Sequence, residues 1–205
     1  MTAKEKIVEA GIYLFNTNGF AATSIRDIAN RAKVNSANIS YYFQGKNGLL
    51  EYCIIHYFEQ YLVILENYLM KVNRKNNLSD LVQLLLNFHF NNRQLSRLVL
   101  REMSLDNQMV REVMATYLMK EKYIFQTIFQ QAIQQQGGKF NPIKFSLFLV
   151  EFKGLMSAPF LNPHYLREVL YIYPSDQYFM DEYQEEICMW INDKINATVK
   201  KKEVS

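Results

Sequence analysis

The chain has 205 residues, of which 49% are hydrophobic, so it buries a sizeable core but is short for two independent domains of average size. Its formal net charge of +3 is too small to establish a nucleic-acid partner. The first residues lack the apolar region of a signal peptide, and no stretch approaches the roughly 20 apolar residues that span a bilayer. We therefore expect a soluble cytoplasmic protein, either one compact unit or a small head on a larger body.

Residue types that commonly carry catalysis or bind metals form no recognised pattern. His56, His89 and His164 are isolated, and Cys53 and Cys188 stand far apart in apolar surroundings, which favours buried free thiols over a disulfide or a metal site. A nucleotide-binding loop and the GxSxG, HExxH and paired CxxC motifs are absent from the sequence. We expect a protein that is not an enzyme and has no cofactor and no metal.

Apolar residues recur at helical spacing and strand-type alternation is absent, which predicts an all-α fold. Thr2 and Glu5 have the spacing of a capping box and Gly19 is a stop signal, so the first helix is expected over residues 3–18. The polar run 73–77 is the best candidate boundary between a head and a body. Further helices are expected at about 25–32, 36–43, 47–72, 79–91, 94–104, 107–135, 142–157, 164–172 and 176–197.

Residues 23–46 carry the strongest local pattern of the chain. Ser24 and Asp27 have capping-box spacing for a short helix, and a three-residue turn over 33–35 follows it. Val34 is expected to fill the space between the two short helices, and Asn35 or Ser36 to cap the second one. Two short helices joined in this way are typical of a helix-turn-helix, whose second helix enters the major groove of DNA.

The second short helix presents Ser36, Ala37, Asn38, Ser40 and Tyr41, a small polar set with one aromatic ring that fits a major groove. An asparagine makes bidentate contacts to adenine, serines bond to several base edges or to phosphates, and alanine or a tyrosine ring contacts thymine methyl groups. Each contact also has a structural alternative, because serine and asparagine cap or hydrate helices where no DNA is present.

Other polar groups of the segment suit the DNA backbone. Thr23, Ser24 and Tyr42 are expected at phosphates, as is Lys46 at the start of the long helix, where free N–H groups favour an anion. Arg26 is expected to reach a phosphate or a guanine at the groove edge. The full set of expected DNA-binding residues is Thr23, Ser24, Arg26, Asn35, Ser36, Ala37, Asn38, Ser40, Tyr41, Tyr42 and Lys46.

The order of residues in the first 50 positions resembles the TetR family of transcriptional regulators. The resemblance rests on Gly19-Phe20, on 23–29, 32–34 and 39–43, and on Lys46-Asn47-Gly48-Leu49-Leu50. It implies an all-α homodimer with an N-terminal three-helix DNA-binding head, here residues 1–46, on a helical-bundle dimerisation and regulatory body, here 47–200.

By position, the resemblance also implies residue roles. Arg26, Ser36, Ala37, Asn38, Ser40 and Tyr41 would face bases, and Ser24, Tyr42 and Lys46 would face phosphates. Ser40 stands where the family often has a tyrosine, so whether Tyr41 or Tyr42 faces the DNA stays open.

Segments of the body, at 92–95, 100–102, 114–126 and 167–179, resemble DNA-binding proteins of spore-forming bacilli. This implies a nucleoid-associated regulator that binds motifs near the replication origin and acts on division-ring assembly and chromosome capture during sporulation, with a division-ring protein as a further partner. A ligand-responsive transcriptional repressor and a helical scaffold that no longer binds DNA are the alternatives.

Two groups of residues in the body have alternative interpretations, and two further segments are expected to form the dimer surface. The aromatic set around Phe125, Phe129 and Phe148 favours core packing over an inducer pocket. The arginines at 93, 97, 101 and 111 favour a solvated face paired with Glu102 and Glu112 over a surface for an acidic partner or for DNA. The dimer surface is expected over 142–157 and 176–197, with buried anchors at Ile187, Trp190 and Ile191.

Overall fold

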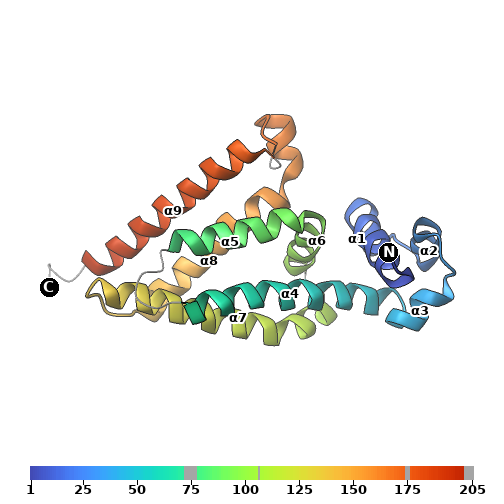
Figure 1. Cartoon of the computed structure of the whole chain (residues 1–205), viewed down its shortest axis with the longest axis horizontal. Coiled ribbons are helices and arrows are strands. Elements are labelled where there is room, and N and C mark those ends of the chain that lie inside the picture. Colours follow the sequence, from blue (N-terminus) through green and yellow to red (C-terminus); the bar gives the residue numbers. More distant parts are fainter. Residues whose placement is uncertain (72–77, 106, 174–175, 201–205) are drawn as a thin grey trace. The chain divides into compact units, whose positions relative to one another are not determined.

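The computed structural model describes residues 1–71, 78–105, 107–173 and 176–200, and every regular element within these ranges is helical (Figure 1). The all-α prediction is confirmed. The elements are α1 (Ala3–Asn18), α2 (Ile25–Ala32), α3 (Ala37–Phe43), α4 (Lys46–Lys71), α5 (Leu78–Asn91), α6 (Arg93–Ser104), α7 (Gln108–Gln135), α8 (Pro142–Leu161), the π-helical turn η1 (Tyr165–Val169) and α9 (Gln177–Lys200).

These helices form two compact units. The first holds residues 1–60 and 92–117, which are α1, α2, α3, α6 and the adjoining parts of α4 and α7. The second holds residues 61–91 and the chain from Leu118 onward, in which α9 packs against α5 and α8. The boundary expected at 73–77 lies outside the described residues.

The first unit is built around α1, which packs against α2, α3 and α6. The Thr2 hydroxyl accepts the N–H of Glu5 at 3.2 Å, and the Glu5 carboxylate accepts the N–H of Thr2 at 2.9 Å. Gly19 ends the helix with φ 83°, a conformation that favours glycine. The predicted caps and bounds of this helix are confirmed. Its buried side chains, Ile7 and Phe15, join the core of the unit.

The core of the second unit is aromatic. The rings of Phe129 and Phe148 lie 4.7 Å apart, and Phe148 stacks on Phe152 at 5.8 Å, which joins α7 to α8. These three side chains are buried, as the packing interpretation predicted. The space left beside them is an apolar cavity of about 10 Å³, room for about one water molecule.

The end of α8 differs from the expected end near residue 157, since the helix continues through Pro159 to Leu161. Proline lacks an N–H, so the carbonyl group of Leu155 loses its helical donor. The hydroxyl of Tyr183, on α9, donates to that carbonyl oxygen at 2.6 Å. Burial raises the pKa of Tyr183 to about 12. The expected helix over 164–172 is also wrong in extent, because only the single turn η1 forms and Tyr171 has φ 54°.

The expected dimer anchors need correction. Ile187 and Ile191 are 1% and 2% exposed within a single chain, so they belong to its own core. The Trp190 ring stacks on Phe148 at 5.4 Å inside the same unit. The apolar side chains that α8 exposes in its first half are instead Ile143, Leu147 and Val150.

The expectation of buried free thiols holds for one of the two cysteines. Cys53 is buried, and burial raises the pKa of its thiol to about 12, whereas Cys188 is only half-buried. His89 is buried, and burial, aided by the charge of Lys153, lowers its pKa to about 3. In the described part of the chain, no group of three or more His, Cys, Asp or Glu side chains has the arrangement of a metal site. No helix within the same residues is long and apolar enough to cross a membrane.

Candidate nucleic-acid interface

The helix-turn-helix begins at Ser24, which caps α2 with a reciprocal pair of hydrogen bonds. The N–H of Asp27 donates to the Ser24 hydroxyl oxygen at 3.1 Å, and the N–H of Ser24 donates to Asp27 Oδ2 at 3.0 Å. The Ser24 hydroxyl itself donates to Oδ2 at 2.6 Å. These hydrogen bonds lower the pKa of Asp27. The predicted capping box is confirmed. In this arrangement the Ser24 hydroxyl group already donates its hydrogen bond to Asp27.

The turn between α2 and α3 sets the start of the second helix. Lys33 ends α2 with φ 55°, and the N–H of Val34 donates to the Ala29 carbonyl oxygen at 3.1 Å. Asn35 Oδ1 accepts the N–H of Ala37 at 2.9 Å, whereas Ser36 makes no side-chain cap. The capping hydrogen bond therefore comes from Asn35, and Ser36, which directly precedes α3, already has helical backbone angles.

One face of α3 is buried and the opposite face is open. Ile39 and Phe43 pack into the unit, as expected for the residues that hold this helix in place. Tyr41 is 81% exposed and Tyr42 is 42% exposed, and their rings meet edge-to-face at 5.0 Å. Tyr41 therefore extends further from the helix. Ser36, Ala37 and Ser40 are exposed, Asn38 is half-buried, and Arg26 on α2 and Asn35 in the turn are exposed.

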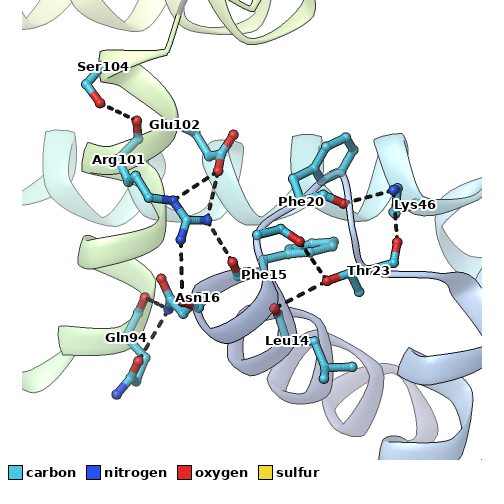
Figure 2. Close-up of polar contacts among 11 residues, drawn as sticks. Leu14, Phe15, Asn16, Phe20, Thr23, Lys46, Gln94, Arg101, Glu102 and Ser104 are labelled. Atoms are coloured by element: carbon cyan, nitrogen blue, oxygen red, sulfur yellow. Dashed lines mark hydrogen bonds and ion pairs between the residues drawn. The ribbon is translucent and has the colours of Figure 1, made fainter.

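Thr23 differs from the other expected contacts because its side chain is only 1% exposed. Its hydroxyl donates to the carbonyl oxygens of Gly19 at 2.8 Å and Leu14 at 3.3 Å. In place of the phosphate contact expected from the sequence, Thr23 ties the loop before α2 to the end of α1 (Figure 2).

Lys46 also has partners within the chain. Its side-chain nitrogen donates to the carbonyl oxygens of Phe20 and Thr23 at 2.9 Å each and of Ala21 at 3.4 Å. The same nitrogen lies 4.5 Å from the centre of the Phe20 ring. Because an ammonium group has three N–H donors, the loop carbonyls take up the donors that the sequence assigned to a phosphate. The first residue of α4 thereby holds the α1–α2 loop (Figure 2).

Sequence reasoning missed a polar contact between α1 and α6, which we call the α1–α6 clamp. Arg101 donates to the Phe15 carbonyl oxygen at 2.8 Å and to Glu102 at 2.9 Å. Asn16 Nδ2 donates to the Gln94 carbonyl oxygen at 2.8 Å. The clamp consists of Asn16, Gln94, Arg101 and Glu102 with the Phe15 carbonyl group (Figure 2). Arg101 pairs with Glu102, but the Glu102 side chain is only 3% exposed, so this pair does not lie on the solvated face that the sequence favoured. Glu112 accepts from Gln108.

The sequence is similar to known proteins that have a helix-turn-helix. Residues 7–53 match the model of the bacterial regulatory proteins of the tetR family. A Bacillus subtilis protein named as a probable HTH-type transcriptional regulator, YttP, is 42% identical over 194 residues, covering 93% of each chain. This chain belongs to the TetR family. It is a TetR-type transcriptional regulator with a DNA-binding helix-turn-helix.

Solved structures share the fold. A chain named "Clostridium perfringens putative fatty acid metabolism regulator" aligns with a TM-score of 0.72 at 18% identity, covering 92% of this chain and 97% of that chain. The regulator FadR of Bacillus subtilis, solved in complex with stearoyl-CoA, aligns with a TM-score of 0.59 at 17% identity, covering 96% of this chain and 98% of that chain. At these identities the likeness concerns the TetR fold alone.

Proposed function

We propose that this TetR-family chain binds pseudo-palindromic DNA as a homodimer, with residues 1–46 as the DNA-binding part and 47–200 as the dimerisation and regulatory part. One observation carries the proposal: α3 buries Ile39 and Phe43 and leaves a small polar face open. A helix of this kind enters a major groove without steric conflict. In a two-fold dimer the half-site centres lie about one turn, roughly 34 Å, apart.

Within this interface we assign base contacts to Arg26, Ala37, Asn38, Ser40 and Tyr41. Asn38 is the main source of specificity, since an asparagine amide makes a bidentate contact to adenine. The large exposed fraction of Tyr41 favours it over Tyr42 for the groove. Of the remaining exposed groups, Asn35, Ser36 and Tyr42 position the protein on phosphates or sugars, whereas the Ser24 hydroxyl donates to Asp27 and serves as the cap of α2.

The dimer surface that we propose includes the outer face of α8. Ile143, Leu147 and Val150 follow one another at helical spacing and are 71%, 53% and 73% exposed. A contiguous apolar stripe on a helix of a regulator that acts as a dimer is best explained by a second copy of the chain.

We extend the proposal to the cellular role expected from the sequence. The body segments resemble the forespore capture DNA-binding protein RefZ, which supports action near the replication origin on division-ring assembly and chromosome capture, with a division-ring protein as partner. The alternative is a ligand-responsive repressor; FadR, which shares the fold, was solved in complex with stearoyl-CoA. The apolar cavity of about 10 Å³ in the second unit has no room for such a ligand in this conformation.

The test is selection of bound duplexes from a random-sequence pool by the full chain, followed by mapping of chromosomal occupancy. We expect a pseudo-palindrome whose binding weakens steeply with salt. Motifs flanking the origin support the division role, and one promoter beside the protein's own gene supports the repressor. A chain that selects no sequence, or binds all duplexes equally, contradicts the proposed function.

A further inference from the structure

The carbonyl end of α1 needs a cation that α1 does not carry. The last turn of this helix contains no basic residue. Carbonyl groups at this end of a helix carry partial negative charge, which a nearby cation stabilises. The Phe15 carbonyl oxygen accepts the N–H of Gly19 at 3.0 Å and has a second acceptor site left. Arg101 supplies the cation from α6, 86 positions further along the chain, by donating to the Phe15 carbonyl oxygen at 2.8 Å. A second, longer contact of 3.5 Å reaches the Asn16 carbonyl oxygen.

The guanidinium group is held in place for this contact. Glu102 is 3% exposed at its side chain, and one of its oxygens accepts from both Nε and Nη2 of Arg101, at 3.3 and 2.9 Å. Two donors of the guanidinium group thus converge on one oxygen of a buried carboxylate, which restricts the orientation of the arginine side chain. The other side of the contact is fixed by Asn16, whose amide donates to the Gln94 carbonyl oxygen at 2.8 Å.

The same turn of α1 also holds the start of the DNA-facing helices. The Leu14 carbonyl oxygen, next to that of Phe15, accepts the hydroxyl of Thr23 at 3.3 Å. Thr23 directly precedes Ser24, the cap of α2. A shift of the last turn of α1 on α6 would therefore move the N-terminus of α2, and α1 also packs directly on α3. Figure 2 shows Arg101, Phe15, Leu14 and Thr23 in this order across the first unit.

We infer that Arg101 is a positioning residue for DNA binding: from α6, it fixes the last turn of α1, and with it the loop that orients α2, without itself contacting DNA. The inference rests on the proposed function. Arg101 differs in this from Arg26, which reaches the DNA directly in the proposed interface.

The experiment uses the full chain and two duplexes of equal length, the one selected by the wild-type protein and one of random sequence. Arg101→Gln is expected to bind the selected duplex about tenfold more weakly, a loss within the range of couplings between separate positions of a protein. Binding to the random duplex changes much less, so the ratio of the two affinities falls. The slope of log K against log salt stays at the wild-type value, because no phosphate contact is lost. Arg101→Lys recovers part of the affinity.

Two further variants keep the test decisive. Arg101→Gln leaves the buried Glu102 charge without its partner and destabilises the fold, so Arg101→Gln/Glu102→Gln provides a neutral pair of similar shape. This double variant is expected to fold, and the ratio of its affinities for the selected and the random duplex should fall as much as in Arg101→Gln. Lys122→Gln removes one exposed positive charge from α7 and is expected to behave as wild type.

Each failure has its own signature. If wild-type protein selects no duplex, the proposed function and the inference both fall. If wild-type protein binds selectively and the neutral pair keeps the wild-type affinity ratio, only the inference is overturned. A salt slope that falls by about 0.9 in Arg101→Gln would instead make Arg101 a phosphate contact. Equal weakening on both duplexes, without rescue by lysine, would reduce its role to stability of the fold.

Discussion

The side-chain nitrogen of Lys46 donates a hydrogen bond of 2.9 Å to the carbonyl oxygen of Thr23, 23 positions earlier in the chain. This contact joins the first residue of α4 to the residue before the α2 cap, and two neighbouring carbonyl groups share the same ammonium. The ammonium group therefore stabilises the loop, and it is the cation that the described contacts show at these three carbonyl groups.

We expect Lys46→Gln to lower the free energy of unfolding by about 1–2 kcal/mol, the range for hydrogen bonds from a charged donor that remains partly exposed. Affinity falls on all duplexes, but the salt slope keeps its wild-type value because the ammonium is bound to the chain. Urea unfolding and titrations at several salt concentrations measure both. Lys6→Gln, at an exposed lysine of α1, is the stability control. A salt slope that is lower by about 0.9 would show that Lys46 contacts a phosphate, as expected from the sequence.

Removal of the Asn38 amide should relax sequence specificity. Asn38→Ala is expected to cost about 1–3 kcal/mol on the selected duplex and little on duplexes with another base at the contacted position. Titration against duplexes that each carry one substituted base pair locates this position. Asn30→Ala removes an exposed asparagine from the neighbouring helix and serves as control. An equal loss at every base pair would remove Asn38 from the base contacts.

The local part of this structure was predictable because its signals lie within a few residues of one another. The capping box of Ser24 with Asp27 and the stop at Gly19 each fix a helix end through hydrogen bonds inside one turn. The alternation of buried Ile39 and Phe43 with exposed neighbours likewise follows from helical spacing. These signals are sufficient to place the helix-turn-helix.

The long-range contacts were not predictable in the same way. Arg101 and Phe15 are 86 positions apart, and the acceptor is a backbone carbonyl group, which every residue has. A side chain that binds backbone therefore leaves no complementary residue type to find in the sequence. The end of α8 shows the same problem. Pro159 indicates a helix end, but the hydroxyl of Tyr183, on another helix, donates to the carbonyl group that the proline leaves without a helical donor.

The contact between Tyr183 and the Leu155 carbonyl group is testable by a double-mutant cycle. Tyr183→Phe leaves this carbonyl without a donor and should lower the free energy of unfolding by about 1–3 kcal/mol. In a Pro159→Ala background, the new N–H of residue 159 donates to the same carbonyl, so Tyr183→Phe costs less. Urea unfolding of the four proteins gives the coupling. Equal costs in both backgrounds would show that the hydroxyl does not compensate for the proline.

His89 should make stability depend on pH. Its pKa falls from 6.5 to about 3 on folding, because burial and then Lys153 disfavour the charged ring. As pH falls below about 6.5, the unfolded chain takes up a proton that the folded chain does not, so stability decreases by up to about 1.4 kcal/mol per pH unit. Between about pH 7.5 and pH 5, we expect wild type to lose about 2 kcal/mol more than His89→Gln in urea unfolding. Equal losses would mean that His89 titrates alike in both states.

The proposed dimer surface is tested by a charge on its apolar stripe. Val150→Glu should yield a monomer in sedimentation experiments, because a second copy would bury the carboxylate. Affinity for a duplex with two half-sites should fall by about 100-fold or more, while binding to a single half-site persists. Met119→Glu, at a 73% exposed position of α7, is the control. A dimeric Val150→Glu protein would place the interface elsewhere.

The α1–α6 clamp also limits how this regulator can be recombined with its relatives. A chimera that takes only residues 1–46 from this chain receives α1 without Arg101, so the Phe15 carbonyl group keeps the N–H of Gly19 but has a cation beside it only if the recipient's α6 supplies one. Transplanted specificity then requires Gln94, Arg101 and Glu102 to travel with the three N-terminal helices. The transferable unit of DNA recognition in this chain is discontinuous in sequence.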